Sequence, residues 1–471
     1  MELNLSATGF WKIENSEKEY IGDLYLNKDK GGIILYIRIP NIGPMLSFLE
    51  LPLEIAFITG TTTNGAKITL VDCLRISTKS RLGSEDIFGY QARFMLDGIT
   101  FNDEKDIKFK KMEISIPGII QWGNISNYVI PDLEDEDTLI GLKATEPIEL
   151  HASKEYRLLY CLTFSIPYQL MEENIHLKQI PYLVIEAELV QSLDWFMKIA
   201  NQMKRLIEIA IGSPLSFDSI IVESPEIYNE FGDGNKYNRP LKVIHTFKQD
   251  IDKEGLSNRI LKHDYLFDLS ELKQANFSKW QEIASIMEPI IELYIDSLYN
   301  QNLSVNRHFL NMVQALETYH SRRIAYSLSD FKKRVNDLLE IRPKAFKEND
   351  KVFLLDGSYK QVILKSRLAD LLLANFRFAF YTGDFKLMDF PQIIASTRNY
   401  YTHYNQRLEN KALKDVDLVN AYHILRNILE FYLLIELGFE EEFIHERIRE
   451  RIRPIINSND IKKAAKNKSY K

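Results

Sequence analysis

Residues 192–212 read SLDWFMKIANQMKRLIEIAIG, and within them the hydrophobic period of the chain changes. Trp195, Ile199 and Met203 recur at intervals that place them on one face of an α-helix. We predict an amphipathic helix that ends near Gly212. Before this stretch the chain has the pattern of strands, and after it two short strand-like runs precede a mostly helical pattern that begins at about Phe277. The stretch is therefore where a helical period first replaces the strand pattern.

The part of the chain before this helix is rich in alternating polar and apolar residues, which is typical of antiparallel strands. Residues 20–40, YIGDLYLNKDKGGIILYIRIP, hold two such runs around a Lys-Gly-Gly turn. Asn64 and Gly65 lie between two further runs and predict a β-hairpin, because Asn-Gly accepts positive φ. Short strand-like runs return in FDSIIVES and LKVIHTF. Strands this frequent predict an antiparallel sandwich or barrel-like sheet.

From about Phe277 onward, the chain predicts a bundle of roughly six helices, because successive segments show a helical apolar stripe. The segments are residues 279–299, 304–323, 328–340, 362–380, 390–407 and 415–437. The predicted fold class is thus α+β, with a β-rich domain at residues 1–265 and a helical bundle at residues 274–457. We expect a linker between Lys262 and Lys273, and a basic tail at residues 458–471.

Charge is divided unevenly along the chain, whose net charge is −7. Residues 261–471 contain 32 basic and 28 acidic side chains, which gives +4 and leaves −11 for the rest. This difference suggests two different roles for the two halves. A charge of +4 is too small to predict nucleic-acid binding by itself.

Cysteine content and hydropathy predict a cytoplasmic protein without a membrane partner. The two cysteines, Cys73 and Cys161, are too few for a disulfide framework and fit a reducing compartment. No apolar run approaches the ~18 residues of a membrane span. The N-terminus lacks the basic and apolar regions of a signal peptide.

The common enzyme motifs are missing from the sequence, including phosphate-binding loops, HExxH, GxSxG and paired CxxC. Nine scattered histidines and two distant cysteines give no metal-ligand spacing, so we predict neither a metal nor a cofactor. The acidic run at residues 132–137 is interpreted as a solvated turn.

One constellation remains in residues 396–405, STRNYYTHYN, where Arg398, Asn399 and His403 form the pattern R-N-x-x-x-H. On a helix Asn399 and His403 stand about 40° apart, and the long Arg398 side chain can reach the same groove. A cation, an amide and an imidazole are the groups that metal-free RNA cleavage needs. We predict these three residues as catalytic. Because one histidine cannot easily be acid and base in the same step, two copies would face each other in a homodimer or higher oligomer.

A structural reading of the same residues stays open. Arginine followed by histidine after four to six residues is a loose pattern, and Arg239 with His245 is a second match. In the structural reading, His403 is a surface or capping residue and Arg398 pairs with a nearby carboxylate.

Four further residues are candidates for RNA contact. Tyr400 and Tyr404 can stack on bases, and Arg322 and Arg323 can face phosphates. The alternatives are core packing for the tyrosines and a solvated basic face for the arginines.

The helical half resembles a HEPN domain, whose hallmark is R-x(4–6)-H, often with a polar residue after the arginine, as in RNYYTH at 398–403. The segment RHFLNMVQALETYHSRR resembles the ALE-x-x-H helix of HEPN domains in the ApeA group. The N-terminal half, with GFWKI, YIGDLYLN, GGIILYI and IEIAIGSPLSFDSI, is similar to the N-terminal domain of that group.

This resemblance implies a bacterial anti-phage protein that acts by abortive infection. Its HEPN domain would be a metal-independent ribonuclease that acts as a dimer on tRNA or other cellular RNA. Arg398 and His403 would be catalytic, with Asn399 in support and Glu317 as a partner residue. The N-terminal domain would sense a phage-derived trigger. A non-catalytic HEPN-like module that binds RNA or protein is the alternative function.

Overall fold

The chain divides into two compact units. The computed structural model describes residues 5–27, 32–40, 51–79, 85–129, 141–166, 176–230, 235–245, 265–300, 302–324, 328–341, 347–351, 363–380 and 385–453. The β unit comprises residues 1–207 and 215–260, and the helical unit comprises residues 208–214 and 261–471. The predicted domain limits, 1–265 and 274–457, stay a prediction.

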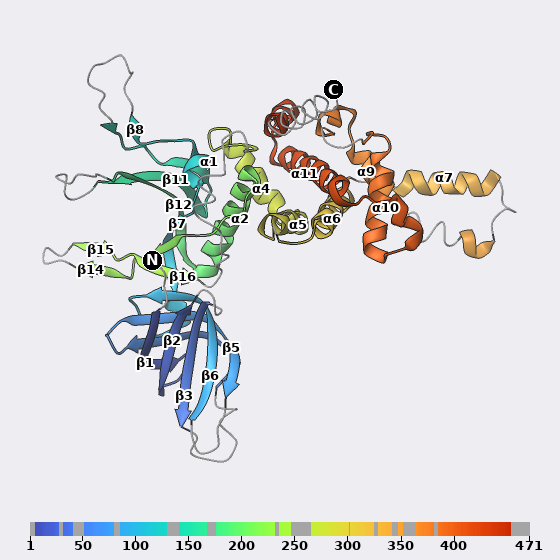
Figure 1. The fold of residues 1–471 in the computed structure, drawn as a ribbon. Helices are drawn as coiled ribbons and strands as arrows, with labels where there is room; N and C mark the ends of the chain where they lie inside the picture. The colour runs from blue at the N-terminus through green and yellow to red at the C-terminus, as the bar shows by residue number, and fades with distance from the viewer. Residues whose placement is uncertain are drawn as a thin grey trace, which may run out of the picture. The chain divides into compact units, whose positions relative to one another are not determined.

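The β unit begins with a closed antiparallel barrel, drawn in blue in Figure 1. Its strands are β1 (Leu5–Ile13), β2 (Glu19–Asn27), β3 (Gly32–Pro40), β4 (Glu54–Thr62), β5 (Lys67–Lys79) and β6 (Glu85–Asp97). They pair in the order β1-β2-β3-β6-β5-β4, and β4 pairs back onto β1. The barrel confirms the predicted β-rich fold class. It also confirms the predicted hairpin, because Gly65, between β4 and β5, has φ of +84°.

Trp11 fills the barrel core and requires glycine on the neighbouring strand. Its side chain is fully buried, and its indole Nε1 donates to the carbonyl oxygen of Gly22 at 3.1 Å. A Cβ atom at Gly60 would lie 2.3 Å from the Trp11 ring. Only glycine therefore lets β4 approach the indole this closely.

The barrel continues into a second stretch of the same sheet, since β6 also pairs with a strand outside the barrel. The order from β6 is β16 (Leu241–His245), β13 (Ser219–Glu223), β7 (Lys108–Ser115), β12 (Lys178–Ser192), β11 (Tyr156–Ser165) and β10 (Ile148–Ala152). The unit also contains two small hairpins, β8 (Tyr128–Val129) with β9 (Gly141–Leu142) and β14 (Tyr228–Glu230) with β15 (Lys236–Asn238), and helix α1 (Ile119–Gly123).

The predicted amphipathic helix is α2 (Leu193–Ile211), and it ends beside Gly212, as predicted. Met203 and Leu206 on its apolar face are fully buried. Its last turn, with the residues up to Pro214, belongs to the helical unit.

The helical unit is built from α4 (Gln274–Ala284), α5 (Glu288–Tyr299), α6 (Val305–Arg323), α7 (Leu328–Ile341), α9 (Leu364–Leu371), α10 (Phe390–His403) and α11 (Asp415–Leu437), with a further helical run at 441–453. Helix α6 contacts α5, α9, α10 and α11. Residues far apart in sequence thus meet around α6, and the C-terminal half matches the predicted bundle (Figure 1).

Two predicted helices are in fact broken. The segment 279–299 divides into α4 and α5, because Pro289 lies in the first turn of α5 and has no N–H for a continuous helix. The segment 362–380 divides into α9 and a 3-10 helix, η6 (Ala374–Ala379). The predicted acidic turn at 132–137 and basic tail at 458–471 lie outside the described residues, and the predicted linker is described only from Tyr265 onward.

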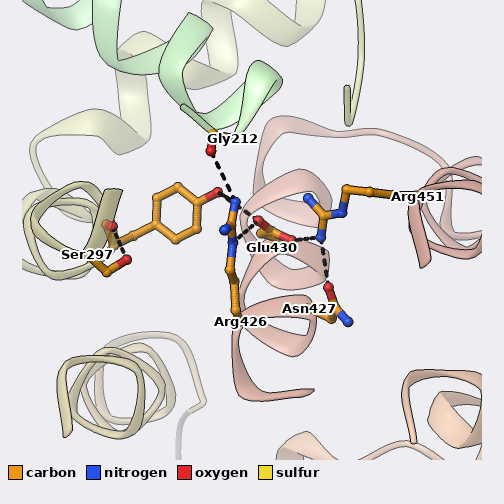
Figure 2. A network of polar contacts seen from close by, with 7 residues as sticks. Gly212, Ser297, Arg426, Asn427, Glu430 and Arg451 are labelled. Atoms are coloured by element: carbon orange, nitrogen blue, oxygen red, sulfur yellow. Dashed lines mark hydrogen bonds and ion pairs between the residues drawn. The ribbon is translucent and has the colours of Figure 1, made fainter. Parts of the chain in front are cut away.

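A buried polar network joins helices α5 and α11 (Figure 2). The carboxylate of Glu430, fully buried on α11, accepts from the Tyr294 hydroxyl at 2.7 Å and from Arg426 Nε at 2.8 Å. Arg451 binds the other carboxylate oxygen of Glu430 and donates to Asn427 Oδ1 at 2.7 Å. Burial favours the neutral acid, but the two arginines outweigh it and lower the pKa of Glu430 to about 2.

Candidate active site

Helix α10 carries the R-N-x-x-x-H residues and ends on the histidine. Pro391 lies in its first turn, where its missing N–H costs no helical hydrogen bond. Tyr404 follows His403 with φ of 48°, and its backbone N–H donates to the carbonyl of Tyr400 at 2.6 Å. The left-handed conformation of Tyr404 stops the helix, so the predicted extension to residue 407 is wrong.

The segment after α10 is tied back to it by Thr397, which is fully buried. The Thr397 hydroxyl donates to the carbonyl of Ile393 at 2.8 Å and accepts from the backbone N–H of Leu413 at 3.1 Å. The Tyr401 hydroxyl donates to the carbonyl of Leu413 at 3.0 Å. These contacts fix the rotation of α10 in the helical unit, and so set the direction of the next residue, Arg398. The role of Tyr401 here is structural.

Arg398 is held by two oxygen acceptors. Its Nη2 donates to Glu317 Oε2 on α6 at 3.2 Å, and its Nη1 donates to Asn399 Oδ1 at 3.2 Å. The side chains of Arg398 and Glu317 are 32% and 29% exposed. A partly exposed pair of this kind contributes about 0–1 kcal/mol, so its main effect is to orient the guanidinium.

Arg398 lines an open pocket of about 630 Å³ between helices α6, α9 and α10. The lining residues are Leu310, Gln314, Glu317, Thr318, Ser321, Arg322, Arg367, Arg398 and Thr402. On α6, residues 310, 314, 317 and 321 are three or four residues apart, so one face of that helix forms a wall, which Thr318 and Arg322 widen. On α10, Arg398 and Thr402 are one turn apart and face the pocket together.

Two further arginines in the lining hold backbone carbonyls. Arg322 donates to the carbonyl of Ile286, and Arg367 Nη1 donates to the carbonyl of Glu317 at 3.3 Å. With Arg398, the lining contains three guanidinium groups and one carboxylate. The pocket is therefore suited to an anion.

The predicted site residues do not all meet at this pocket. Within the described residues, Asn399, His403, Tyr400 and Tyr404 are outside its lining. His403 and Tyr404 are exposed, while Tyr400 is half-buried, with its ring 5.8 Å from that of Tyr404. One chain therefore brings Arg398 and Asn399 together but places His403 at the exposed helix end.

The two arginines predicted to contact RNA lie in different surroundings. Arg322 lines the pocket, whereas Arg323 forms a two-pronged ion pair with Glu436 on α11, at 2.8 and 2.6 Å. Glu436 is 8% exposed and also accepts from the Tyr319 hydroxyl at 2.9 Å. Arg323 therefore neutralises a nearly buried carboxylate.

Sequence reasoning missed Arg367 and Thr402. Thr402 lies one helical turn after Arg398, and that spacing alone could have identified it. Arg367 reaches the pocket from α9, and no motif links it to α10.

Among the described residues, no three His, Cys, Asp or Glu side chains gather as ligands for a metal ion. In the same part of the chain, every helix is too short or too polar to cross a membrane.

The helical unit, with R-N-x-x-x-H on α10, is of the HEPN class by its family match. Residues 6–280 match the family described as ApeA N-terminal domain 1, and residues 310–443 match the family described as Apea-like HEPN. The chain belongs to the ApeA family, which is associated with anti-phage defence. No curated protein and no solved structure matches the chain.

The HEPN match contains the complete candidate site, from Glu317 on α6 to His403 on α10. HEPN domains are generally associated with ribonuclease activity, and they commonly bind RNA and act as dimers. The match thus supports an anti-phage HEPN module.

Proposed function

We propose that the chain is a metal-independent endoribonuclease that acts in abortive infection. The observation that carries the proposal is the oriented Arg398 guanidinium in an anion-suited pocket, with an exposed His403 on the same helix. Both residues lie within the HEPN match.

In the proposed reaction, a base removes the proton from a ribose 2′-OH, and the 2′-oxygen attacks the adjacent phosphorus. The bond from phosphorus to the 5′-oxygen breaks, and an acid protonates that oxygen as it leaves. The Arg398 guanidinium stabilises the negative charge of the phosphorane, and the Asn399 amide and the Glu317 carboxylate hold the guanidinium in place. The products are a 2′,3′-cyclic phosphate and a 5′-hydroxyl.

Two copies of His403 divide the acid and base roles in this proposal. A single imidazole cannot accept one proton and donate another in one step. The exposed end of α10 leaves His403 accessible to a second copy of the chain. A two-fold axis beside this end would bring two histidines and two arginines to one cleft.

Cleavage of labelled RNA by the purified full chain in EDTA tests the proposal directly. We expect cleavage to continue after chelation, because no step uses a metal ion. Mass spectrometry of the products should find 2′,3′-cyclic phosphate ends. Cleavage that stops in EDTA and returns with magnesium would contradict the mechanism.

A mixing experiment tests the shared cleft. Protomers with Arg398→Ala and protomers with His403→Ala should each be nearly inactive alone. Their mixture should stay nearly inactive as well, because a mixed dimer has one histidine for two proton transfers. Wild-type protomers that exchange freely with an equal amount of His403→Ala protomers should keep about a quarter of the activity of wild type at the same total concentration, because one dimer in four then has both histidines. An active protein that light scattering finds to be strictly monomeric at assay concentration would rule the cleft out.

A non-catalytic module that binds RNA or protein is the second candidate function. The observation that favours it is the ion pair between Arg398 and Glu317, which also fits a structural role for the arginine. RNA binding without cleavage in every condition tested, with equal affinity in His403→Ala, would select this alternative.

The β unit is proposed as the regulator of the helical unit. The charge difference of −11 against +4 supports different roles for the two parts of the chain. A phage-derived trigger, a tRNA or other cellular RNA target and a cytoplasmic location all remain proposals.

A further inference from the structure

The pocket beside Arg398 contains more cationic groups than the proposed cleavage step requires. That step needs one guanidinium from each chain, yet Arg322 and Arg367 also line the pocket. They come from α6 and α9, outside the R-N-x-x-x-H motif. Within the lining they face a single carboxylate, that of Glu317.

Glu317 brings two of these guanidinium groups toward each other. Its carboxylate accepts from Arg398 at 3.2 Å, and its backbone carbonyl accepts from Arg367 at 3.3 Å. A guanidinium has five N–H donors in a planar fork that matches phosphate oxygens. Ser321 lies in the same lining and adds a neutral hydroxyl. The Thr402 hydroxyl donates to the backbone carbonyl of Arg398 at 2.8 Å, so it can only accept a further hydrogen bond.

The pocket is larger than a single phosphate group. Its volume of about 630 Å³ falls within the ~300–1,000 Å³ of typical small-ligand sites. Leu310 is the one aliphatic side chain among its nine lining residues, so the lining suits a polar, anionic occupant. A nucleotide, with a phosphate and a hydroxyl-bearing ribose, has this character.

The pocket also lies at a suitable distance from the histidine. Arg398 and His403 are five residues apart on α10, which corresponds to about 7.5 Å along the helix axis. This is the scale of one nucleotide step in an unstacked strand.

Resting on the proposed function, we propose that this pocket holds the RNA nucleotide next to the scissile bond, with its phosphodiester on Arg322 and Arg367, while Arg398 holds the scissile phosphate. The scissile phosphate lies toward His403, and the neighbouring phosphate lies in the pocket. The site therefore selects single-stranded RNA whose bases are unstacked where the strand enters the pocket.

Binding measurements in a cleavage-deficient chain test this inference separately from catalysis. The full chain with His403→Ala is titrated with a fluorescent single-stranded RNA in EDTA over a range of salt concentrations. Adding Arg367→Gln should weaken binding by about tenfold or more and lower the salt slope by about 0.7, the value for one phosphate contact. Arg307→Gln, an equal charge change on α6 outside the lining, is the control and should leave both quantities near their starting values.

A second variant covers the case in which Arg367→Gln fails to fold. Ser321 is exposed and lines the pocket, so Ser321→Asp adds a carboxylate that competes with phosphate. It should weaken RNA binding as Arg367→Gln does. Ser304→Asp, at the start of the same helix and outside the pocket, is its charge-matched control.

Neutral methylphosphonate linkages, placed one at a time along the RNA, identify the phosphate concerned. One methylphosphonate linkage should reduce the affinity of the RNA for the chain with an intact pocket. The same linkage should have no further effect in Arg367→Gln, because the phosphate and Arg367 then no longer interact. Pocket variants that bind every RNA as the controls do would overturn the inference, even if the chain cleaves RNA. The inference would also be overturned if adenosine monophosphate competed completely with the RNA and no single linkage changed the RNA affinity. The pocket would then bind a free nucleotide. A pocket-dependent linkage without any cleavage would support the inference and count against the proposed enzyme.

Discussion

Replacing His403 by alanine should slow RNA cleavage by roughly 100- to 10,000-fold, the range that acid–base groups contribute. In the proposed cleft this one substitution removes both the proton acceptor and the proton donor, because each copy contributes its histidine. The measurement is the single-turnover rate of cleavage with enzyme in excess. The variant should still bind RNA through the arginine-lined pocket.

Thermal unfolding provides the control for this substitution. His403 is exposed at the last position of α10, so its loss should leave the unfolding temperature nearly unchanged. His423→Ala is a comparison on α11 outside the candidate site. An unfolding temperature that falls by many degrees in His403→Ala, with RNA cleavage intact, would assign the histidine a structural role.

Replacing Glu430 by alanine should lower the free energy of unfolding of the helical unit by about 3–5 kcal/mol. The substitution leaves the guanidinium groups of Arg426 and Arg451 without their shared carboxylate, and it leaves the buried Tyr294 hydroxyl without its acceptor (Figure 2). Denaturant titration of the full chain, followed by helical circular dichroism, measures the change. Glu409→Ala, which breaks an exposed pair with Lys414, should cost about 1 kcal/mol or less.

The Glu430 carboxylate makes the stability of the helical unit depend on pH in the acid range. The pKa of Glu430 falls from an ordinary 4.5 to about 2 in the folded chain. A lowered pKa stabilises the fold above about pH 4.5, and this contribution is lost as the pH falls toward 2. Between these values wild type should lose stability faster than Glu430→Gln. Parallel stability curves for the two proteins would show that the network does not hold an ionised carboxylate.

Local patterns predicted the elements of the fold better than their ends and contacts. The four-residue spacing of Trp195, Ile199 and Met203 sufficed for α2, because burying one face decides whether such a helix forms. Pro289 was a readable signal for the break between α4 and α5. The break after α9 had no such signal. There the Tyr432 hydroxyl, from α11, donates to the carbonyl of Leu371 at 2.8 Å and satisfies the helix end.

The candidate site was likewise predictable in its local pattern and not in its tertiary contacts. The R-N-x-x-x-H pattern, which includes Asn399, is local and was visible in the sequence. The pocket depends on how α6, α9 and α10 pack, so Arg367 could not be assigned to it from spacing alone. The different surroundings of Arg322 and Arg323 arise from the position of Glu436 on α11. Tyr404 ends α10 in a left-handed conformation, and no glycine or proline at that position marked the helix end in the sequence.

The path of the chain between the two units bears on how the protein is synthesised and inherited. Residues 208–214 belong to the helical unit, yet the chain then returns to the β unit to form β13 and β16. The carbonyl of Gly212 accepts from Arg426 at 3.3 Å, and Glu208 accepts from the Tyr299 hydroxyl. During translation this early segment must wait for α5 and α11 to leave the ribosome before it gains these partners. A gene fragment that begins at residue 261 encodes the candidate site without that segment, so recombination at the apparent boundary does not transfer a complete helical unit.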